Sequence, residues 1–274
     1  MGTARGNRGP PVIFGMFSFL RGTPSYRLGL DLRSQSIVAV MLDHQGVVQQ
    51  RREGSGSTEF NDLAEMLPQL LSHFPIQQCQ VVMSLTPGYN FKVADLKSRE
   101  PLEVRYEAER WLPYNTCEAS FAWHALGSAS TLTMAYPTEL LNRLANMLRP
   151  LRPRSLAWEI REMVYARTLN QAGLPAALAE LSSDWLRLAF ASEEEFYSVS
   201  HYLTADKEVN LAYAVERLLD YRQVRRKPPP QSLWVNAAAQ KALQKVDLEL
   251  LPLCEDFVAV GLANSPAGTH QFTL

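Results

Sequence analysis

Apolar and polar residues alternate in short blocks over the first third of the chain, a pattern typical of strands with interspersed helices. Leu28 to Leu32 and Ile37 to Leu42 are apolar runs joined by a short polar turn, which predicts a pair of strands. A third strand is expected from Gly46 to Arg52. Leucines at helical spacing predict a helix from Asn61 to Leu71, and the apolar run from Gln80 to Leu85 predicts a buried strand.

The middle of the chain has an α+β pattern. Phe91 to Leu96 alternates as a strand, and Pro101 stands where the first turn of a helix tolerates proline. The helix predicted from Pro101 to Leu112 places four apolar residues on one face: Val104, Ala108, Trp111 and Leu112. The elements expected next are strands over Ser120–Leu126 and Thr131–Ala135, a helix capped by Thr138, a strand ending near Ile160, and a helix over Arg161–Gln171.

The last third repeats the order of the first. The pattern predicts strands at Ala177–Leu181, Trp185–Ala191 and Glu195–Tyr202, a helix from about Val209 to Arg226, a strand at Ser232–Asn236 and a helix at Ala238–Val246, with Phe257–Ala263 closing the domain. Three antiparallel strands, a helix, a strand and a helix thus occur twice, without a repeat at the level of residues. We therefore expect an α/β fold of two lobes, with ligands in the cleft at the strand ends.

Composition narrows the classes of function. Hydrophobic residues make up 46% and charged residues 20% of the 274 residues, as in globular proteins. The formal net charge of −1 gives no overall field that attracts nucleic acid, so we expect no nucleic-acid partner. The three cysteines and five histidines show no disulfide framework, metal-ligand spacing or nucleophile motif. A reducing cytoplasm fits this cysteine usage.

The N-terminal apolar run, Val12 to Leu20, follows a basic start rich in glycine and proline. It is too short to span a bilayer. Three interpretations remain open: a leader that packs locally, a shallow anchor at a membrane surface, and an export signal. Because Arg21 follows directly and no small-x-small cleavage site is present, we expect no export.

Several stretches resemble a known family. GLDLRSQSIVAVML is similar to the opening strand-turn-strand of bacterial actin-like proteins, in particular the PilM-like proteins of type IV pilus assembly. Two later stretches are also similar to PilM-like motifs: EAERWLPYNTCEASFAWHALG, Glu107 to Gly127, and FVAVGLA, Phe257 to Ala263. The resemblance covers about Met16 to Ala263 in element order. It implies an α/β fold that is a two-lobed actin-like (ribonuclease-H-like) duplication with an inserted α+β subdomain.

The same resemblance implies domain boundaries. We expect a leader over residues 1–21, a first actin-like lobe over 22–171 with the inserted subdomain at about 89–154, and a second lobe over 172–274. Met16 is an alternative start, because the residues after it are similar to the short N-terminus of PilM-like proteins.

The resemblance also implies a nucleotide site, with Mg²⁺ held by one acidic residue from each hairpin. Its candidate cofactor-binding residues here are Asp31, Ser34, Gln35, Ser36 and Glu180. The first hairpin departs from the family pattern at Arg33, Gln35 and Val38. In the later motifs Glu180 replaces an aspartate, Ser182 replaces a glycine, and the segment Asn236 to Gln240 contains no glycine. We therefore expect no catalytic residues, no metal and no cofactor, with ATP and Mg²⁺ as the alternative.

The function implied is that of a cytoplasmic scaffold on the inner membrane of a type IV pilus-like, or related type II secretion, machine. The expected partner is the N-terminal tail of a PilN-like membrane protein, bound between the first lobe and the inserted subdomain. The candidate partner-binding residues are Phe91, Val93, Val104, Trp111 and Tyr114. A motor ATPase, a platform protein and self-association are further candidates. The alternatives are an active actin-like ATPase and a GspL-like secretion domain.

Overall fold

The computed structural model describes most of the chain after residue 24. The described residues are 25–33, 35–56, 60–85, 90–95, 100–126, 130–172, 175–181, 185–192, 196–202, 213–217, 219–220, 223, 229–230, 232–243, 248–265 and 271–273. The expected leader, Ser34, Ser182 and much of the helix expected from Val209 to Arg226 lie outside these residues. None of the described helices is long and apolar enough to cross a membrane.

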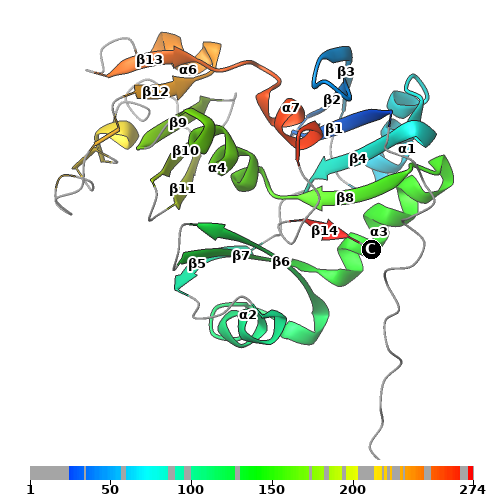
Figure 1. Ribbon diagram of the computed structural model, residues 1–274, viewed down its shortest axis with the longest axis horizontal. Coiled ribbons are helices and arrows are strands. Elements are labelled where there is room, and N and C mark those ends of the chain that lie inside the picture. Colours follow the sequence, from blue (N-terminus) through cyan, green and yellow to red (C-terminus); the bar gives the residue numbers. More distant parts are fainter. Residues whose placement is uncertain are drawn as a thin grey trace, which may run out of the picture.

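The first sheet contains both ends of the described chain (Figure 1). Its strands are β1 (Tyr26–Leu32), β2 (Ser36–Asp43), β3 (Val48–Ser55), β4 (Cys79–Ser84), β8 (Ser155–Glu159) and β14 (Phe272–Thr273), in the spatial order β14-β8-β4-β1-β2-β3. Strands β1 to β3 are antiparallel, whereas β4 and β8 run parallel to β1 and β4, respectively. The hairpin predicted from the apolar runs at the start of the chain is confirmed.

The second sheet repeats this arrangement. Its strands are β9 (Ala176–Leu181), β10 (Trp185–Ala191), β11 (Phe196–Tyr202), β12 (Ser232–Val235) and β13 (Glu249–Pro252), in the order β11-β10-β9-β12-β13. Strands β9 to β11 are antiparallel, and β12 and β13 continue the sheet in parallel. The order therefore matches β3-β2-β1-β4-β8, which confirms the predicted duplication of topology. Sequence patterning did not identify β13 or β14, because four and two residues are too short for a clear period.

A third, three-stranded sheet is inserted between β4 and α3 (Thr138–Leu148). It consists of β5 (Asn90–Asp95), β7 (Ser130–Pro137) and β6 (Ala119–Leu126) in that order, with α2 (Pro101–Ala108) on the side away from the two lobes (Figure 1). Helix α2 ends at Ala108, four residues earlier than predicted, and a turn closed by the bond from the Leu112 N–H to the Ala108 carbonyl follows it. Thr138 is the first residue of α3 rather than its cap, and its hydroxyl pairs with that of Ser120.

Further helices pack on these sheets. They are α1 (Phe60–Leu71), α4 (Arg161–Ala172), α6 (Ala237–Ala242) and α7 (Phe257–Ala263). Helix α4 leads from β8 of the first sheet to β9 of the second and packs on β9, β10 and α7. Helix α7 packs on β1, β2 and β4, although it lies in the range expected for the second lobe. The C-terminal segment thus belongs to the first sheet by packing.

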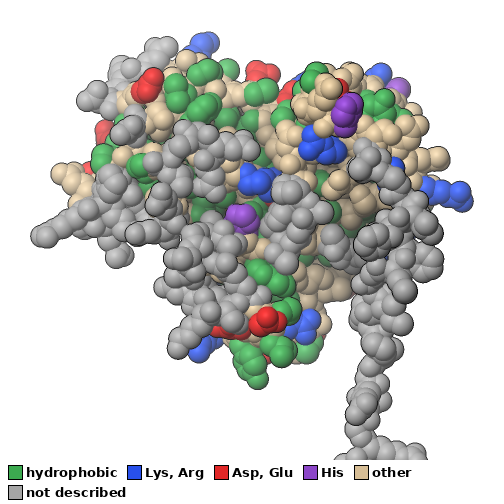
Figure 2. All heavy atoms as spheres, in the orientation of Figure 1, with side chains coloured by type: hydrophobic (Ala, Val, Ile, Leu, Met, Phe, Trp, Pro, Cys, Tyr) green, Lys and Arg blue, Asp and Glu red, His purple; other side chains and the backbone are tan. Residues whose placement is uncertain are grey.

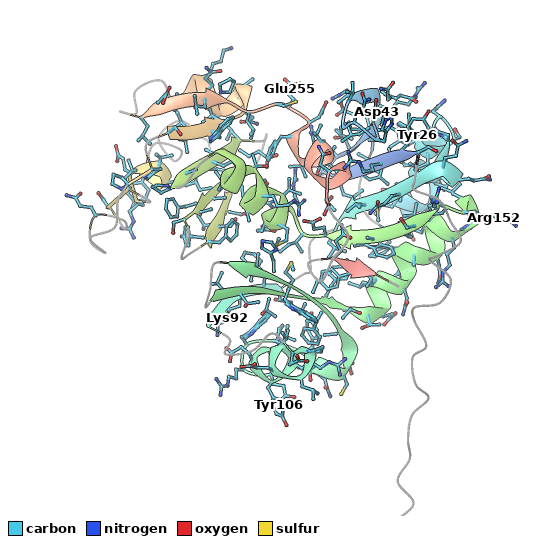
Figure 3. All side chains as sticks on the ribbon, viewed as in Figure 1. Tyr26, Asp43, Lys92, Tyr106, Arg152 and Glu255 are labelled. Carbon is cyan, nitrogen blue, oxygen red and sulfur yellow. The ribbon has the colours of Figure 1, made fainter. Side chains whose placement is uncertain are left out.

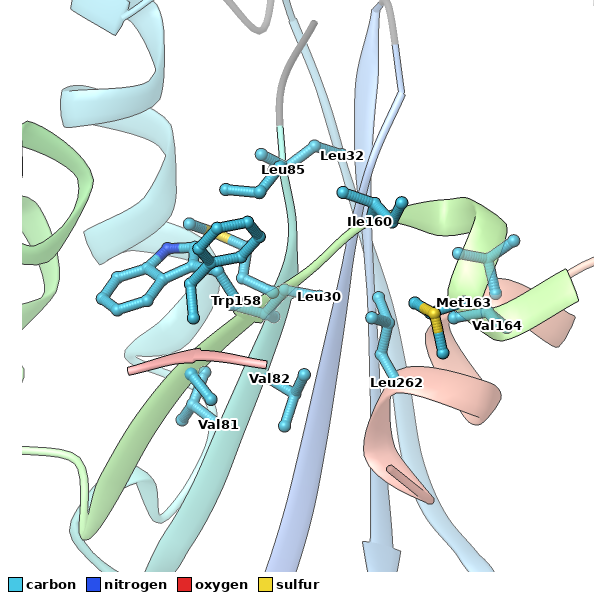
Figure 4. Close-up of a cluster of buried hydrophobic side chains, with 14 of the residues drawn as sticks. Leu30, Leu32, Val81, Val82, Leu85, Trp158, Ile160, Met163, Val164 and Leu262 are labelled. Atoms are coloured by element: carbon cyan, nitrogen blue, oxygen red, sulfur yellow. The ribbon is translucent and has the colours of Figure 1, made fainter. Parts of the chain in front are cut away.

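One continuous core joins α4 and α7 to the first sheet. Figure 4 shows Leu30, Val82 and Trp158 on the sheet, with Met163 of α4 and Leu262 of α7 nearby. All five side chains are buried. Because both helices pack on this core, the position of α4 between the lobes is fixed by apolar contacts as well as by its polar residues.

Glycine allows α7 to approach the sheet closely. A Cβ atom on Gly29 of β1 would lie 1.8 Å from the carbonyl oxygen of Ala259, and one on Gly261 would lie 2.3 Å from Cγ1 of Val164. Both distances are far inside van der Waals contact. Backbone therefore packs on backbone where α7 crosses β1.

Candidate functional site

The turn between β1 and β2 is the first half of the predicted site. Its backbone is closed by the Arg33 N–H, which donates to the Ser36 carbonyl at 2.8 Å. The carbonyl of Gln35 accepts from the N–H of Gly56 at 2.9 Å, while its side chain is exposed. Ser36 is half-buried, and Ser34 lies outside the described residues.

Asp31 lies at the end of β1 with its side chain fully buried. Its Oδ2 accepts from Nε of Arg33 at 3.0 Å and from Nη2 of Arg161 at 3.1 Å. Its Oδ1 has no hydrogen-bond partner among the residues that the structure describes. Because a buried carboxylate is costly unless it is paired, these two arginines compensate for the burial of Asp31.

Glu180 lies near the end of β9, the strand that corresponds to β1 in the second sheet. Its Oε1 accepts from the same Nη2 of Arg161 at 3.2 Å, and its Oε2 accepts from the hydroxyl of Tyr165. Arg187 of β10 donates to that hydroxyl at 3.2 Å. Burial raises the pKa of Tyr165, so its hydroxyl remains a donor to Glu180 at all ordinary pH values.

The structure thus brings together the two acidic residues that the sequence pointed to, with a guanidinium between them. Arg161 is the first residue of α4 and is almost fully buried. Sequence patterning missed it, because an arginine in the first turn of a helix is normally a solvent-exposed residue. Since Arg161 contacts both carboxylates, the position where they could share a cation is filled by a side chain.

A second buried polar cluster lies at the end of β8. Glu159 is fully buried and pairs with Arg167 of α4, and it also accepts from the Ser265 hydroxyl at 2.6 Å. Arg167 donates through Nη2 to the carbonyl of Gly261 at 3.1 Å, and Gln271 donates to Ser265 at 2.8 Å. This cluster connects β8 and α4 to the C-terminal segment.

The third predicted motif, Asn236 to Gln240, has a structural role at the start of α6. The side chain of Asn236 caps the helix by accepting from Ala239 N–H at 3.1 Å. It also donates to the Leu181 carbonyl at 2.9 Å and accepts from the Leu181 N–H at 3.1 Å. The side-chain amide of Asn236 is therefore committed to joining β9 to α6.

The five candidate partner-binding residues do not share one surface. Phe91 and Val93 pair with Met134 and Leu132 of β7 and pack, half-buried, against the main core. Their neighbour Lys92 has its side chain on the opposite face of the sheet, where it forms a 3.4 Å ion pair with Glu107 of α2.

The other three candidates belong to the α2 side of the subdomain. Val104 is fully buried against Phe121 and Trp123, so it is not available to a partner. Trp111 and Tyr114 follow α2 and are half-buried, and the Tyr114 hydroxyl lies 3.4 Å from the Asn90 amide. Alternation along β5 separates Phe91 and Val93 from the helix with which the sequence grouped them.

The outer face of α2 carries the two most exposed large hydrophobic side chains among the described residues. Leu102 and Tyr106, one helical turn apart, are 71% and 68% exposed. Figure 3 shows Tyr106 at the end of the molecule farthest from the lobes, and Figure 2 shows hydrophobic side chains gathered at that end beside charged ones. This pair is therefore separate from the cluster formed by Asp31, Arg161 and Glu180.

Comparisons with known proteins bear on the fold. No protein-family model matches the sequence, and no curated protein matches it. Among solved structures, the chain is similar to one of a PilM-PilN type IV pilus biogenesis complex, with a TM-score of 0.67, 14% identity, and coverage of 86% of this chain and 97% of that one.

Two other structures have the same fold. The cytoplasmic domain of EpsL, an inner-membrane component of the type II secretion system of Vibrio cholerae, matches with a TM-score of 0.57 and 12% identity over 87% of this chain and 94% of that one. A protein of unknown function from Bacteroides thetaiotaomicron with an actin-like ATPase fold matches with a TM-score of 0.54 and 9% identity over 92% and 100%. The chain therefore has the two-lobed actin-like fold that the resemblance implied.

Proposed function

We propose that the protein is a cytoplasmic scaffold of a type IV pilus-like, or related type II secretion, machine at the bacterial inner membrane. The observation that carries the proposal is the likeness to the PilM-PilN complex, which extends over nearly the whole of that solved chain. The likeness to the cytoplasmic domain of EpsL supports the same class of role. By this analogy, the partner is the short cytoplasmic tail of a PilN-like membrane protein.

The proposed binding surface lies between the three-stranded sheet and the first lobe. Phe91 and Val93 are on the face of that sheet that packs toward the main core, and both remain partly exposed there. A tail with a few apolar residues could bury them against these side chains, with polar neighbours fixing its register. Trp111 and Tyr114 remain candidates at the edge of the subdomain, whereas the burial of Val104 limits it to a supporting role.

Replacing Val93 with serine is expected to weaken binding of the tail about 5- to 30-fold, because one apolar anchor contributes roughly 1–2 kcal/mol. Fluorescence polarisation with a labelled tail peptide measures the change. The matched control is Lys92→Ser, one residue away on the opposite face, which should bind as the wild type does. Equal affinities of the two folded variants would place the tail elsewhere.

The proposal includes loss of ATP hydrolysis. Arg161 lies between the carboxylates that would hold Mg²⁺, and Asn236 is committed to a helix cap; both observations support this. We expect calorimetric titration with ATP and Mg²⁺ to show no micromolar binding, and phosphate release to stay at background. Micromolar affinity, with turnover abolished by Asp31→Ala, would instead identify an active actin-like ATPase.

A further inference from the structure

One nitrogen atom joins two carboxylates from different lobes. Nη2 of Arg161 is 3.1 Å from Oδ2 of Asp31 on β1 and 3.2 Å from Oε1 of Glu180 on β9. The exposed fractions of the three side chains are 6%, 0% and 12%, so the ion pairs are shielded from bulk water. Because β1 and β9 are corresponding strands of the two sheets, the bridge joins equivalent positions of the duplicated fold.

We propose that Arg161 is a tethered cation that occupies a latent divalent-metal site formed by Asp31 and Glu180. While the guanidinium is in place, the carboxylates are closed to Mg²⁺ or Mn²⁺ and the lobes are joined without a metal. Removing the guanidinium exposes a site that binds a hard divalent cation. This inference concerns cation binding alone and does not depend on the proposed membrane partner.

The chemistry of the donors supports a metal site beneath the arginine. Mg²⁺ and Mn²⁺ favour carboxylate oxygens and retain several waters, so two carboxylates are a sufficient protein contribution. Oδ1 of Asp31 is buried and has no hydrogen-bond partner among the described residues, which leaves an acceptor for a cation or its water. The described residues contain no group of three or more metal-ligating side chains, so a metal here depends on this carboxylate pair.

The properties of arginine explain why a metal does not compete. A guanidinium is charged at every ordinary pH, and its fork of donors matches carboxylate geometry. Arg161 is also part of α4, which the core holds between the lobes. The guanidinium is therefore always present beside the carboxylates, whereas the occupancy of a metal ion depends on its concentration in solution. Arg33 contacts Asp31 as well, but its other partners are Glu255 and Asp256 near the start of α7.

The test is a titration of the protein with Mn²⁺ as the only added ligand. Binding is measured as a decrease in the electron paramagnetic resonance signal of the free ion. Arg161→Gln is expected to bind one Mn²⁺ with a Kd on the order of 0.1–1 mM. The wild type should bind at least about tenfold more weakly, and Arg161→Lys, which keeps a positive charge near both carboxylates, should also bind Mn²⁺ more weakly than Arg161→Gln does. Adding Asp31→Asn and Glu180→Gln to Arg161→Gln should abolish the binding.

Arg33→Gln is the matched control, because it removes the other arginine on Asp31 but leaves the bridge to Glu180. It is expected to gain no Mn²⁺ affinity. A natively folded Arg161→Gln protein, judged by near-ultraviolet circular dichroism, that binds no Mn²⁺ would overturn the inference. An equal gain in Arg33→Gln would do the same.

The wild type supplies a test that does not require a folded Arg161 variant. Its residual Mn²⁺ binding should not change when Asp31→Asn is introduced, since that carboxylate is already occupied by the guanidinium. A loss of Mn²⁺ binding in Asp31→Asn would show that the wild-type site is open, and the inference would fail. Binding of the partner's tail peptide is measured separately, by fluorescence polarisation. A negative result in one experiment therefore does not contradict the other proposal.

Discussion

Arg167→Met is expected to destabilise the protein by about 3–5 kcal/mol, because it leaves the buried carboxylate of Glu159 without its cationic partner. Glu159 is fully buried, and its carboxylate also accepts a hydrogen bond from the Ser265 hydroxyl. The substitution also removes the donor to the Gly261 carbonyl, so the link from α4 to α7 is weakened as well. Urea unfolding followed by circular dichroism measures the loss.

Two further variants separate charge burial from loss of side-chain packing. Arg110→Met removes an exposed ion pair with Glu107 and should cost at most about 1 kcal/mol. The double variant Arg167→Met with Glu159→Gln should recover part of the lost stability, because no uncompensated charge remains. If Arg167→Met were as stable as Arg110→Met, the cluster at the end of β8 would not hold the C-terminal segment.

Gly29→Ala is expected to cost about 3 kcal/mol or more, which is at or above the usual cost of overpacking a core. The added Cβ would lie 1.8 Å from the carbonyl oxygen of Ala259, so α7 must move away from β1. The midpoint of urea unfolding should fall accordingly. Gly54→Ala is the matched control, since its Cβ would lie 3.4 Å from atoms of the Met66 side chain. Similar midpoints for both variants would contradict the close packing of α7.

The elements of the fold were predictable where the apolar period was long enough. The hairpin of β1 and β2 was clear because two apolar runs flank a polar turn, and α1 was clear because leucines recur on one face of twelve residues. The same succession of strands and helices was predicted for the last third of the chain, whereas the spatial order of the strands in each sheet was not. The packing of α7 on β1 could not be predicted, because no local pattern marks Gly29 as a contact for residues more than two hundred positions later.

The candidate site was predictable only in part, because contacts between distant segments leave no local pattern in the sequence. Asp31 and Glu180 were identified because the resemblance to actin-like proteins implies one acidic residue in each hairpin. Arg161 was missed because its role comes from a contact with both sheets, and a single arginine at a helix start carries no pattern. Phe91 and Val104 were grouped by closeness in sequence, but the alternation of β5 and the position of α2 place them on opposite sides of a sheet.

The return of α7 and β14 to the first sheet has a consequence for the order in which the protein matures. A ribosome releases β1, β2 and β4 first, but the helix that covers them lies more than 170 residues after β4. The strands of the second sheet can pair before α7 is synthesised. The face of the first sheet that α7 covers stays exposed until then. Nascent chains arrested before residue 257 should therefore bind chaperones through the first lobe.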